Sequence, residues 1–309
     1  MARRLSHIVC GLVPLFFLLM VGTVAGGSPV ASHQRTAGQH RDLIATGYDL
    51  VGEDGGVFVF NGNFYGSLPG LGIRVHNIVG IVPSADYRGY FLVGSDGGVF
   101  AFGDVTFAGS LPGIGVTPTL PIVGIVPTSD DRGYFLVGSD GGVFAFGDAQ
   151  FEGSLPGIGA RVNDVASIAS TPDNQGYWVL EKSGQVSNFG TAPDLATDPV
   201  NGGPLPNFEG LPYYANITST TTGQGYWVLD SYGGVWTYGD ANWWGDATVQ
   251  AAGGTGERPV SLVGTADNQG YWIVTVNGDV VPCGDAENFG SLPGIGVKPN
   301  LAIVGAVPT

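Results

Sequence analysis

One sixteen-residue sequence, GYFLVGSDGGVFAFGD, occurs twice in identical form, starting at Gly89 and again 44 residues later at Gly133. Its opening Gly-Tyr pair recurs along the chain at residues 47, 89, 133, 176, 225 and 270, with intervals of 42, 44, 43, 49 and 45 residues. A period of this length indicates a repeat architecture, in which each unit folds into one supersecondary element and packs against its neighbours. The repeat is therefore the strongest constraint on the fold.

Each unit predicts a series of short strands. In the third unit, the β-branched run Ile122–Val126 ends at Pro127, and further strands are expected at Tyr134–Gly138, at Val143–Phe146 and in a short segment near Phe151. Four strands per unit are typical of a propeller blade. The sequence therefore predicts an all-β, six-bladed β-propeller of four-stranded blades. A seven-bladed or truncated ring is the alternative, and a β-solenoid, whose repeats are usually shorter, is the rival architecture.

The two ends of the repeat region complement each other. Residues 301–309 repeat the first strand of a unit and then stop, whereas the first unit runs from Leu43 straight into Gly47 without that strand. A C-terminal strand placed beside Leu50 would close the ring and remove the exposed sheet edges. We therefore expect one propeller domain over residues 43–309, with the strand near Ile303 beside the strand near Leu50.

The expected hairpin turns share a glycine at their second position, after a residue that varies. The pairs are Asp54-Gly55, Asp96-Gly97, Asp140-Gly141, Ser183-Gly184, Tyr232-Gly233 and Asn277-Gly278. Such pairs favour two-residue type I′ turns, in which both central residues have positive φ. Because the first position varies, we interpret these aspartates as turn residues and not as ligands.

The N-terminus has the pattern of an export signal. Arg3 and Arg4 precede the uncharged apolar stretch Ile8–Val24, and small residues follow it. We expect residues 1–31 to be a signal peptide, residues 32–42 to be a leader, and the mature protein to be secreted or held at the cell surface. An uncleaved anchor is the alternative, because the stretch approaches the length that spans a bilayer.

Charge and residue counts exclude several classes of partner and chemistry. Without Arg3 and Arg4, nine of the 11 Lys and Arg remain against 26 acids, and no basic cluster exists for nucleic acid or an anionic membrane surface. His76 is the single histidine of the repeats, which argues against a catalytic triad or a zinc site. We expect no catalytic residues, no metal and no cofactor. Paired carboxylates of the kind that glycosidases use remain an open alternative.

Cys283 is the one cysteine left after signal removal, so no internal disulfide can form. It occupies the position of Phe102 and Phe146 in other units. We predict that Cys283 is buried and unreactive.

The units resemble a repeat of secreted proteins of actinobacterial type, whose consensus reads approximately GYWLVxxDGGVFxFGDA. Residues 89–104 and 133–149 match it closely, and residues 225–241 and 270–286 match it recognisably. In that family the repeats often accompany extracellular hydrolase domains that act on cell-wall or polysaccharide material. The resemblance implies an extracellular, non-catalytic, propeller-like module, and it carries over no catalytic residue.

Aromatic residues in the fourth and fifth units indicate a candidate site. Trp243 occupies the position of Phe107 and Phe151, whereas Trp244 is the one tryptophan outside the apolar pattern. Tyr213 and Tyr214 end the insertion that lengthens the fourth interval. Exposed rings with a polar edge suit hydroxyl-rich ligands. We predict a binding patch formed by Tyr213, Tyr214, Trp243 and Trp244, with the shielding of a blade edge as the alternative role of Trp244.

Three functions are compatible with these patterns. The sequence favours an exported, non-catalytic recognition module that binds a cell-wall or other extracellular glycan, or a protein partner. The first alternative is an extracellular carbohydrate-active hydrolase or lyase that uses paired carboxylates. The second alternative is a structural surface protein whose repeats contact one another, although the divergence of units four and five argues against uniform self-assembly.

Overall fold

The computed structural model describes residues 47–195, 205, 213–247 and 257–309. The predicted signal peptide and leader, and most of the insertion before Tyr213, lie outside the described residues. The described chain contains eighteen β-strands and four short 3-10 helices. Within these ranges, no helix is long and apolar enough to cross a bilayer.

The strands form six three-stranded antiparallel sheets, which we number I to VI along the chain. From inner to outer strand they are sheet I, β18 (Ile303–Pro308), β1 (Tyr48–Gly52) and β2 (Val57–Phe60); sheet II, β3 (Ile78–Pro83), β4 (Gly89–Gly94) and β5 (Val99–Gly103); sheet III, β6 (Ile122–Pro127), β7 (Tyr134–Gly138) and β8 (Val143–Phe146); sheet IV, β9 (Val165–Ser170), β10 (Gly176–Glu181) and β11 (Val186–Gly190); sheet V, β12 (Tyr214–Ser219), β13 (Gly225–Asp230) and β14 (Val235–Gly239); and sheet VI, β15 (Pro259–Gly264), β16 (Gly270–Thr275) and β17 (Val280–Gly284).

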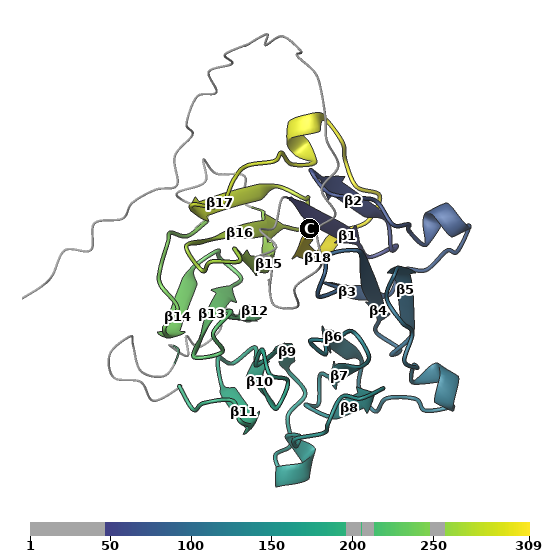
Figure 1. Cartoon of the computed structure of the whole chain (residues 1–309), viewed down its shortest axis with the longest axis vertical. Coiled ribbons are helices and arrows are strands. Elements are labelled where there is room, and N and C mark those ends of the chain that lie inside the picture. The colour runs from purple at the N-terminus through teal and green to yellow at the C-terminus, as the bar shows by residue number, and fades with distance from the viewer. Residues whose placement is uncertain (1–46, 196–204, 206–212, 248–256) are drawn as a thin grey trace, which may run out of the picture.

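The sheets stand around a common axis in a propeller-like arrangement (Figure 1). Their inner strands contact one another in the cyclic order β3, β6, β9, β12, β15, β18 and back to β3, so sheet II lies opposite sheet V. As predicted, the C-terminal strand β18 pairs with β1, with Leu50 opposite Ala306. Residues from the two ends of the described chain thus share sheet I.

The predicted fourth strand is absent from every sheet of the described chain. The segment around Phe151 is irregular and leads into a 3-10 helix. Such helices follow sheets I, II, III and VI, as η1 (Pro69–Leu71), η2 (Pro112–Ile114), η3 (Pro156–Ile158) and η4 (Pro293–Ile295). The Leu155 amide donates to the hairpin carbonyl of Gly141 at 3.2 Å, and Pro156 has no amide hydrogen. The segment therefore caps the hairpin instead of pairing along the outer strand.

The hairpin turns also differ from the prediction of two-residue type I′ loops. In sheet I the Gly55 amide donates to the Gly52 carbonyl at 2.8 Å, and the Gly52 amide donates to the Gly56 carbonyl at 2.9 Å. Gly55 has φ of 74°, whereas Asp54 is not among the residues with positive φ. This pattern is a three-residue loop that ends in a left-handed glycine, which is the usual turn with a G1 bulge. Asp54 Oδ1 accepts the Gly56 amide hydrogen at 2.9 Å, which supports its interpretation as a turn residue.

The core lies between neighbouring sheets. The residue after each Gly-Tyr pair packs on the tyrosine of the next sheet, as in Phe91 with Tyr134, whose ring centroids are 5.2 Å apart. Tryptophan fills this position in sheets IV to VI, where these side chains are at most 2% exposed; they are Trp178, Trp227 and Trp272. Cys283 is buried at 1% exposure, which confirms the prediction of its burial.

Sheet I breaks this core pattern with Asp49. Its side chain is fully buried, and neither carboxylate oxygen has a hydrogen-bond partner among the described residues. Burial raises the pKa of this carboxyl group to about 7. Asp49 therefore places an ionisable group where every other sheet has an aromatic ring.

Candidate functional site: the central cavity and its mouth

A cavity of about 400 Å³ lies on the axis, lined by the inner strands of all six sheets. The third residue of each inner strand lines it, and these residues are Gly80, Gly124, Ser167, Asn216, Ser261 and Gly305. Glycine at this position leaves sheets I to III with an apolar wall of valine and isoleucine, whereas sheets IV to VI present hydroxyl and amide groups. The cavity therefore has one apolar half and one polar half.

The polar half is held together by hydrogen bonds between sheets. Asn216 Oδ1 accepts the Leu262 amide hydrogen at 3.1 Å, and Thr218 Oγ1 donates to the Leu262 carbonyl at 2.8 Å. Asn216 Nδ2 also donates to Ser167 Oγ at 3.4 Å, so the network spans sheets IV, V and VI. These bonds fix the orientation of the polar groups in advance of any ligand. All described residues that line the cavity are uncharged.

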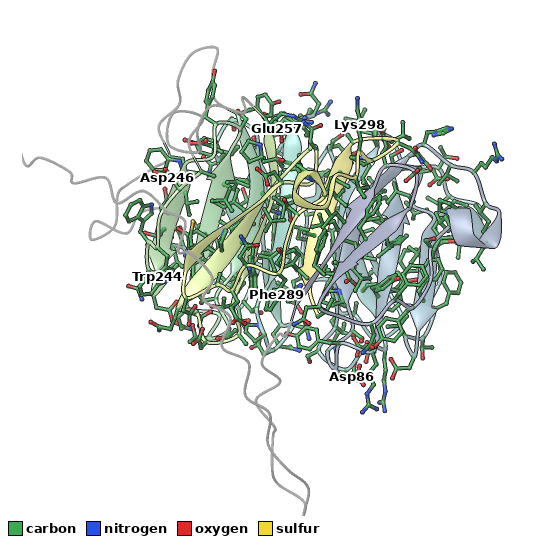
Figure 2. The ribbon with its side chains drawn as sticks, turned by 90° about the horizontal axis from the view of Figure 1, so that it is seen from above. Asp86, Trp244, Asp246, Glu257, Phe289 and Lys298 are labelled. Atoms are coloured by element: carbon green, nitrogen blue, oxygen red, sulfur yellow. The ribbon has the colours of Figure 1, made fainter. Side chains whose placement is uncertain are left out.

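The ring has two unlike faces. Figure 2 shows Asp86 at one face and Glu257 with Lys298 at the other. We call the first the loop face, because it carries the connections from inner to middle strands, at residues 84–88, 128–132, 171–175, 220–224 and 265–269. The opposite face carries the hairpin turns. The loop face forms one mouth of the cavity, since residues of three of these loops line it.

Each connection on the loop face has one residue in the left-handed conformation. These residues are Tyr87, Asp131, Asn174, Gly223 and Asn268, with φ between 55° and 70°. Asn, Asp and Gly tolerate this conformation, whereas a bulky side chain there is an outlier. Tyr87, with φ of 57°, is therefore the exception in the series.

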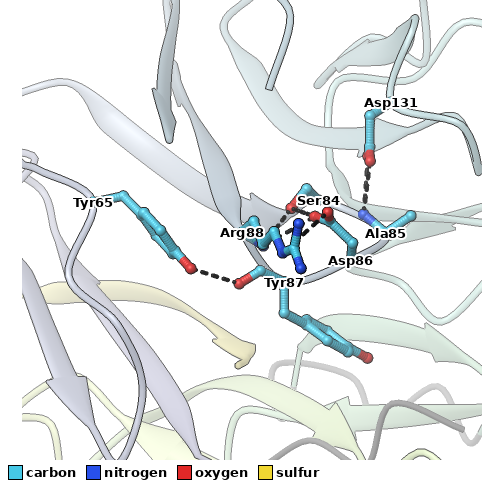
Figure 3. A network of polar contacts seen from close by, with 7 residues as sticks. All are labelled: Tyr65, Ser84, Ala85, Asp86, Tyr87, Arg88 and Asp131. Carbon is cyan, nitrogen blue, oxygen red and sulfur yellow. Dashed lines mark hydrogen bonds and ion pairs between the residues drawn. The ribbon is translucent and has the colours of Figure 1, made fainter. Parts of the chain in front are cut away.

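Two of these left-handed residues, Asp131 and Asn268, join neighbouring loops. Both oxygens of Asp131 accept the Ala85 amide hydrogen, at 3.0 and 2.9 Å. Asn268 Oδ1 likewise accepts the Thr221 amide hydrogen at 3.0 Å, and its Nδ2 donates to Thr221 Oγ1 at 2.6 Å. Figure 3 shows that the ring of Tyr87 points away from the Ser84–Arg88 contacts and from Asp131. Tyr87 instead lines the cavity, and burial raises the pKa of its hydroxyl group, which is neutral at physiological pH.

Two aromatic side chains hold the carbonyls of these loops. Tyr65 OH donates to the Tyr87 carbonyl at 3.1 Å, and Trp244 Nε1 donates to the Asn268 carbonyl at 3.0 Å. Tyr65 and Trp244 occupy equivalent positions in the repeat. Each lies in the segment after an outer strand and is followed directly by a glycine, Gly66 or Gly245. They thus make the same contact in sheets I and V, each to the next sheet along the chain.

The structure separates the four residues of the predicted aromatic patch. Tyr213 and Trp243 are 39% and 41% exposed, but no hydrogen bond or ring contact within the described ranges joins them. Trp244 is half-buried and packs against the core between sheets V and VI. Tyr214 is 1% exposed, so its predicted place on an exposed patch is wrong. Its position as the first residue of β12 directs the ring into the core beside Gly184.

Sequence reasoning missed two parts of this surface. Tyr232 is 41% exposed at the hairpin turn of sheet V, and its neighbour Ser231 donates its amide hydrogen to the Tyr213 carbonyl at 2.9 Å. The signal was present, because Tyr232 stands where other turns have Asp, Asn or Ser. The second omission was the cavity, whose signal is the change from glycine to Ser or Asn at the third position of the inner strands.

Acidic groups lie on the loop face outside the cavity. Thr265 Oγ1 donates to Asp267 Oδ1 at 2.9 Å and approaches Asp285 Oδ1 at 3.5 Å. Burial and the neighbouring Asp267 raise the pKa of Asp285. In the described part of the chain, no group of three or more His, Cys, Asp or Glu residues could hold a metal ion.

Comparisons with known proteins give little beyond this geometry. No protein-family model matches the chain, and no curated protein matches its sequence. Among solved structures, the chain is similar to the beta-propeller domain of Cps50 (Swd1) from Myceliophteria thermophila. The similarity covers 79% of this chain and 81% of that one, at 10% sequence identity and a TM-score of 0.44.

Proposed function

We propose that this protein is an exported, non-catalytic recognition module that binds a neutral, hydroxyl-rich ligand, of the kind an extracellular glycan presents, in its central cavity. The observation that carries the proposal is the uncharged lining of that cavity. The chain has 26 acidic and 11 basic residues, yet the described lining contains none of them. A charged ligand would find no counter-ion there, whereas hydroxyl groups would find partners of their own kind.

The size and the two halves of the cavity support such a ligand. A volume of about 400 Å³ falls within the range of small-molecule sites, which are mostly apolar with a few well-placed polar groups. Sugars have both characters, because their C–H faces are apolar and their edges carry hydroxyl groups. The Asn216 network supplies amide and hydroxyl partners on one side, and the valine and isoleucine wall supplies an apolar surface on the other.

The same proposal treats the molecule as a six-bladed propeller whose ring is closed by β18. Its support is the cyclic order of inner-strand contacts and the pairing of β18 with β1. In this interpretation the irregular segment before each 3-10 helix covers the outer edge of a blade in place of a fourth strand. Export rests on the signal-like pattern of residues 1–31 and on the resemblance to secreted repeats.

A second candidate function is recognition of a protein partner on sheet V. It is favoured by two exposed aromatic residues at the hairpin-turn end of this sheet, Tyr213 and Tyr232, which are linked by the hydrogen bond from the Ser231 amide to the Tyr213 carbonyl. Rigid aromatic side chains often dominate the energy of protein interfaces. A partner bound there would contact the outside of the ring and not the cavity.

The test is binding of purified protein to neutral polysaccharides, both as insoluble cell-wall material and as soluble oligosaccharides, with chromatography of the supernatant for cleavage products. Asn216→Ala should weaken binding at least tenfold, because it removes the amide that links sheets IV to VI. Asn242→Ala, an exposed position in the segment that follows β14, serves as the matched control and should bind normally. Release of shorter sugars would favour the hydrolase alternative, and failure to bind any neutral glycan would refute the proposal.

A further inference from the structure

We propose that Tyr87 is the stacking platform for one sugar ring at the loop-face mouth of the cavity, opposite Thr221 and Asn268. This inference rests on the proposed function, and it adds the residue, the part of the ligand and the face from which the ligand enters.

The residue at this position departs from what its backbone favours. The equivalent residues are Asp131, Asn174, Gly223 and Asn268, all of which suit a left-handed backbone. A tyrosine with φ of 57° is strained, and strain of this kind persists where the surroundings or a function maintain it. Asp131 and Asn268 each bond to the loop of the preceding sheet, whereas sheet I has no inner-to-middle loop among the described residues, so Tyr87 has no equivalent bond to make. Fold stability alone would favour Asn at position 87.

The ring occupies a useful place instead. Tyr87, Thr221 and Asn268 line the same cavity, although they belong to sheets II, V and VI. Because sheet II lies opposite sheet V in the cyclic order, Tyr87 faces the loop of Thr221 across the axis. A sugar ring between them would have its C–H face on the Tyr87 ring and its hydroxyl edge toward Thr221 and Asn268.

The polar side of this mouth is able to bind hydroxyl groups. Thr221 Oγ1 accepts a hydrogen bond from Asn268 Nδ2 at 2.6 Å, which leaves the hydroxyl proton of Thr221 available for donation. Asn268 retains the second hydrogen of its amide. These groups match the alternating donors and acceptors of vicinal sugar hydroxyls.

The two sides of the mouth are held from outside by matching contacts. Tyr65 OH donates to the carbonyl of Tyr87, and Trp244 Nε1 donates to the carbonyl of Asn268. Trp244 and Tyr65 are therefore positioning residues for the two sides of the mouth. Preorganisation of this kind lowers the entropy lost when a ligand binds.

The test uses four soluble probes, chitotetraose, cellotetraose, maltotetraose and mannotetraose, titrated into the full protein by calorimetry. Tyr87→Asn restores the residue type of the repeat. It should raise Tm by about 2–4 °C, because the strain of a bulky left-handed residue is relieved, and weaken the binding of any bound probe tenfold or more. Tyr87→Phe keeps the ring and should bind within threefold of wild type. Asn174→Gly, at the equivalent position of another loop, is the matched control and should bind normally.

The possible outcomes separate this inference from the proposed function. Loss of binding in Tyr87→Asn with an unchanged or raised Tm supports the stacking role. Binding of a probe by wild type and by Tyr87→Asn with equal affinity overturns the inference and leaves the proposed function standing. If wild type binds none of the four probes or other neutral glycans, both proposals fail together.

Discussion

Replacement of Asp49 by Asn should remove a large pH dependence from the stability of this protein. Asp49 is fully buried, its carboxylate oxygens have no hydrogen-bond partner among the described residues, and burial raises its pKa from 3.8 to about 7. In the unfolded chain the group ionises near its ordinary pKa, so the folded state holds a proton that the unfolded state releases. The free energy of unfolding therefore falls as pH rises from about 4 to about 7.

The magnitude follows from the shift. The contribution of Asp49 to folding stability is fully present below the pKa of the unfolded chain, 3.8. It is lost as the pH rises through the pKa of the folded protein, about 7. A shift of about three units corresponds to roughly 4 kcal/mol of lost stability above pH 7. Asp49→Asn has no ionisable group, so it should match wild type near pH 4 and exceed it by at least ~2 kcal/mol at pH 8.

Urea denaturation followed by tryptophan fluorescence, at several values between pH 4 and pH 8, measures this difference. A second variant, Phe91→Asp, places an acid at the equivalent position of sheet II. Its free energy of unfolding should likewise fall as the pH rises from 4 to 8. The reasoning fails if wild type and Asp49→Asn lose the same free energy between pH 4 and pH 8. A carboxyl resonance of Asp49 that titrates near pH 4 in the folded protein would refute it directly.

Three further predictions concern stability. Deletion of residues 301–309 removes β18 and leaves β1 with an unpaired edge, so Tm should fall sharply; a Tm equal to wild type would contradict the role of β18 in sheet I. Trp244→Ala removes packing and an indole hydrogen bond and should cost about 2–4 kcal/mol in chemical denaturation, whereas Trp243→Ala, on the exposed rim, should change stability by less than ~0.5 kcal/mol. Leu111→Ala should cost about 2–5 kcal/mol because it creates a cavity beneath η2, and Ile114→Ala at the exposed tip should be nearly neutral in thermal denaturation.

Sequence reasoning succeeded where one unit carries the whole signal. The strands Tyr134–Gly138 and Val143–Phe146 were predicted with their observed bounds, because continuous apolar runs and bounding glycines are local features. The pairing of β18 with β1 was also predictable, because the end of the chain repeats a strand that the first unit lacks. The burial of Cys283 followed from its equivalence to Phe102 and Phe146.

Predictions from local sequence patterns were wrong where contacts with other parts of the fold determine the structure. The segment near Phe151 does not pair as a fourth strand, because the Glu152 amide and the Gly153 carbonyl bond to the Tyr177 hydroxyl of the next sheet. Trp243 and Trp244 were predicted to lie in one patch, whereas Trp243 is exposed on the rim, as are Phe107 and Phe151, and Trp244 is half-buried. Apolar character alone does not reveal whether a loop residue faces a sheet or solvent.

The sequence by itself determined the number of units, three strands of each, the positions of their glycine turns and the aromatic core between them, because each depends on contacts within a unit or between adjacent units. Only the tertiary structure decided the cavity and its mouth. Tyr87, Thr221 and Asn268 come from sheets II, V and VI, and the cyclic order of six sheets places them around one axis. A site of this kind has no sequence spacing of its own, since its geometry arises from the ring as a whole.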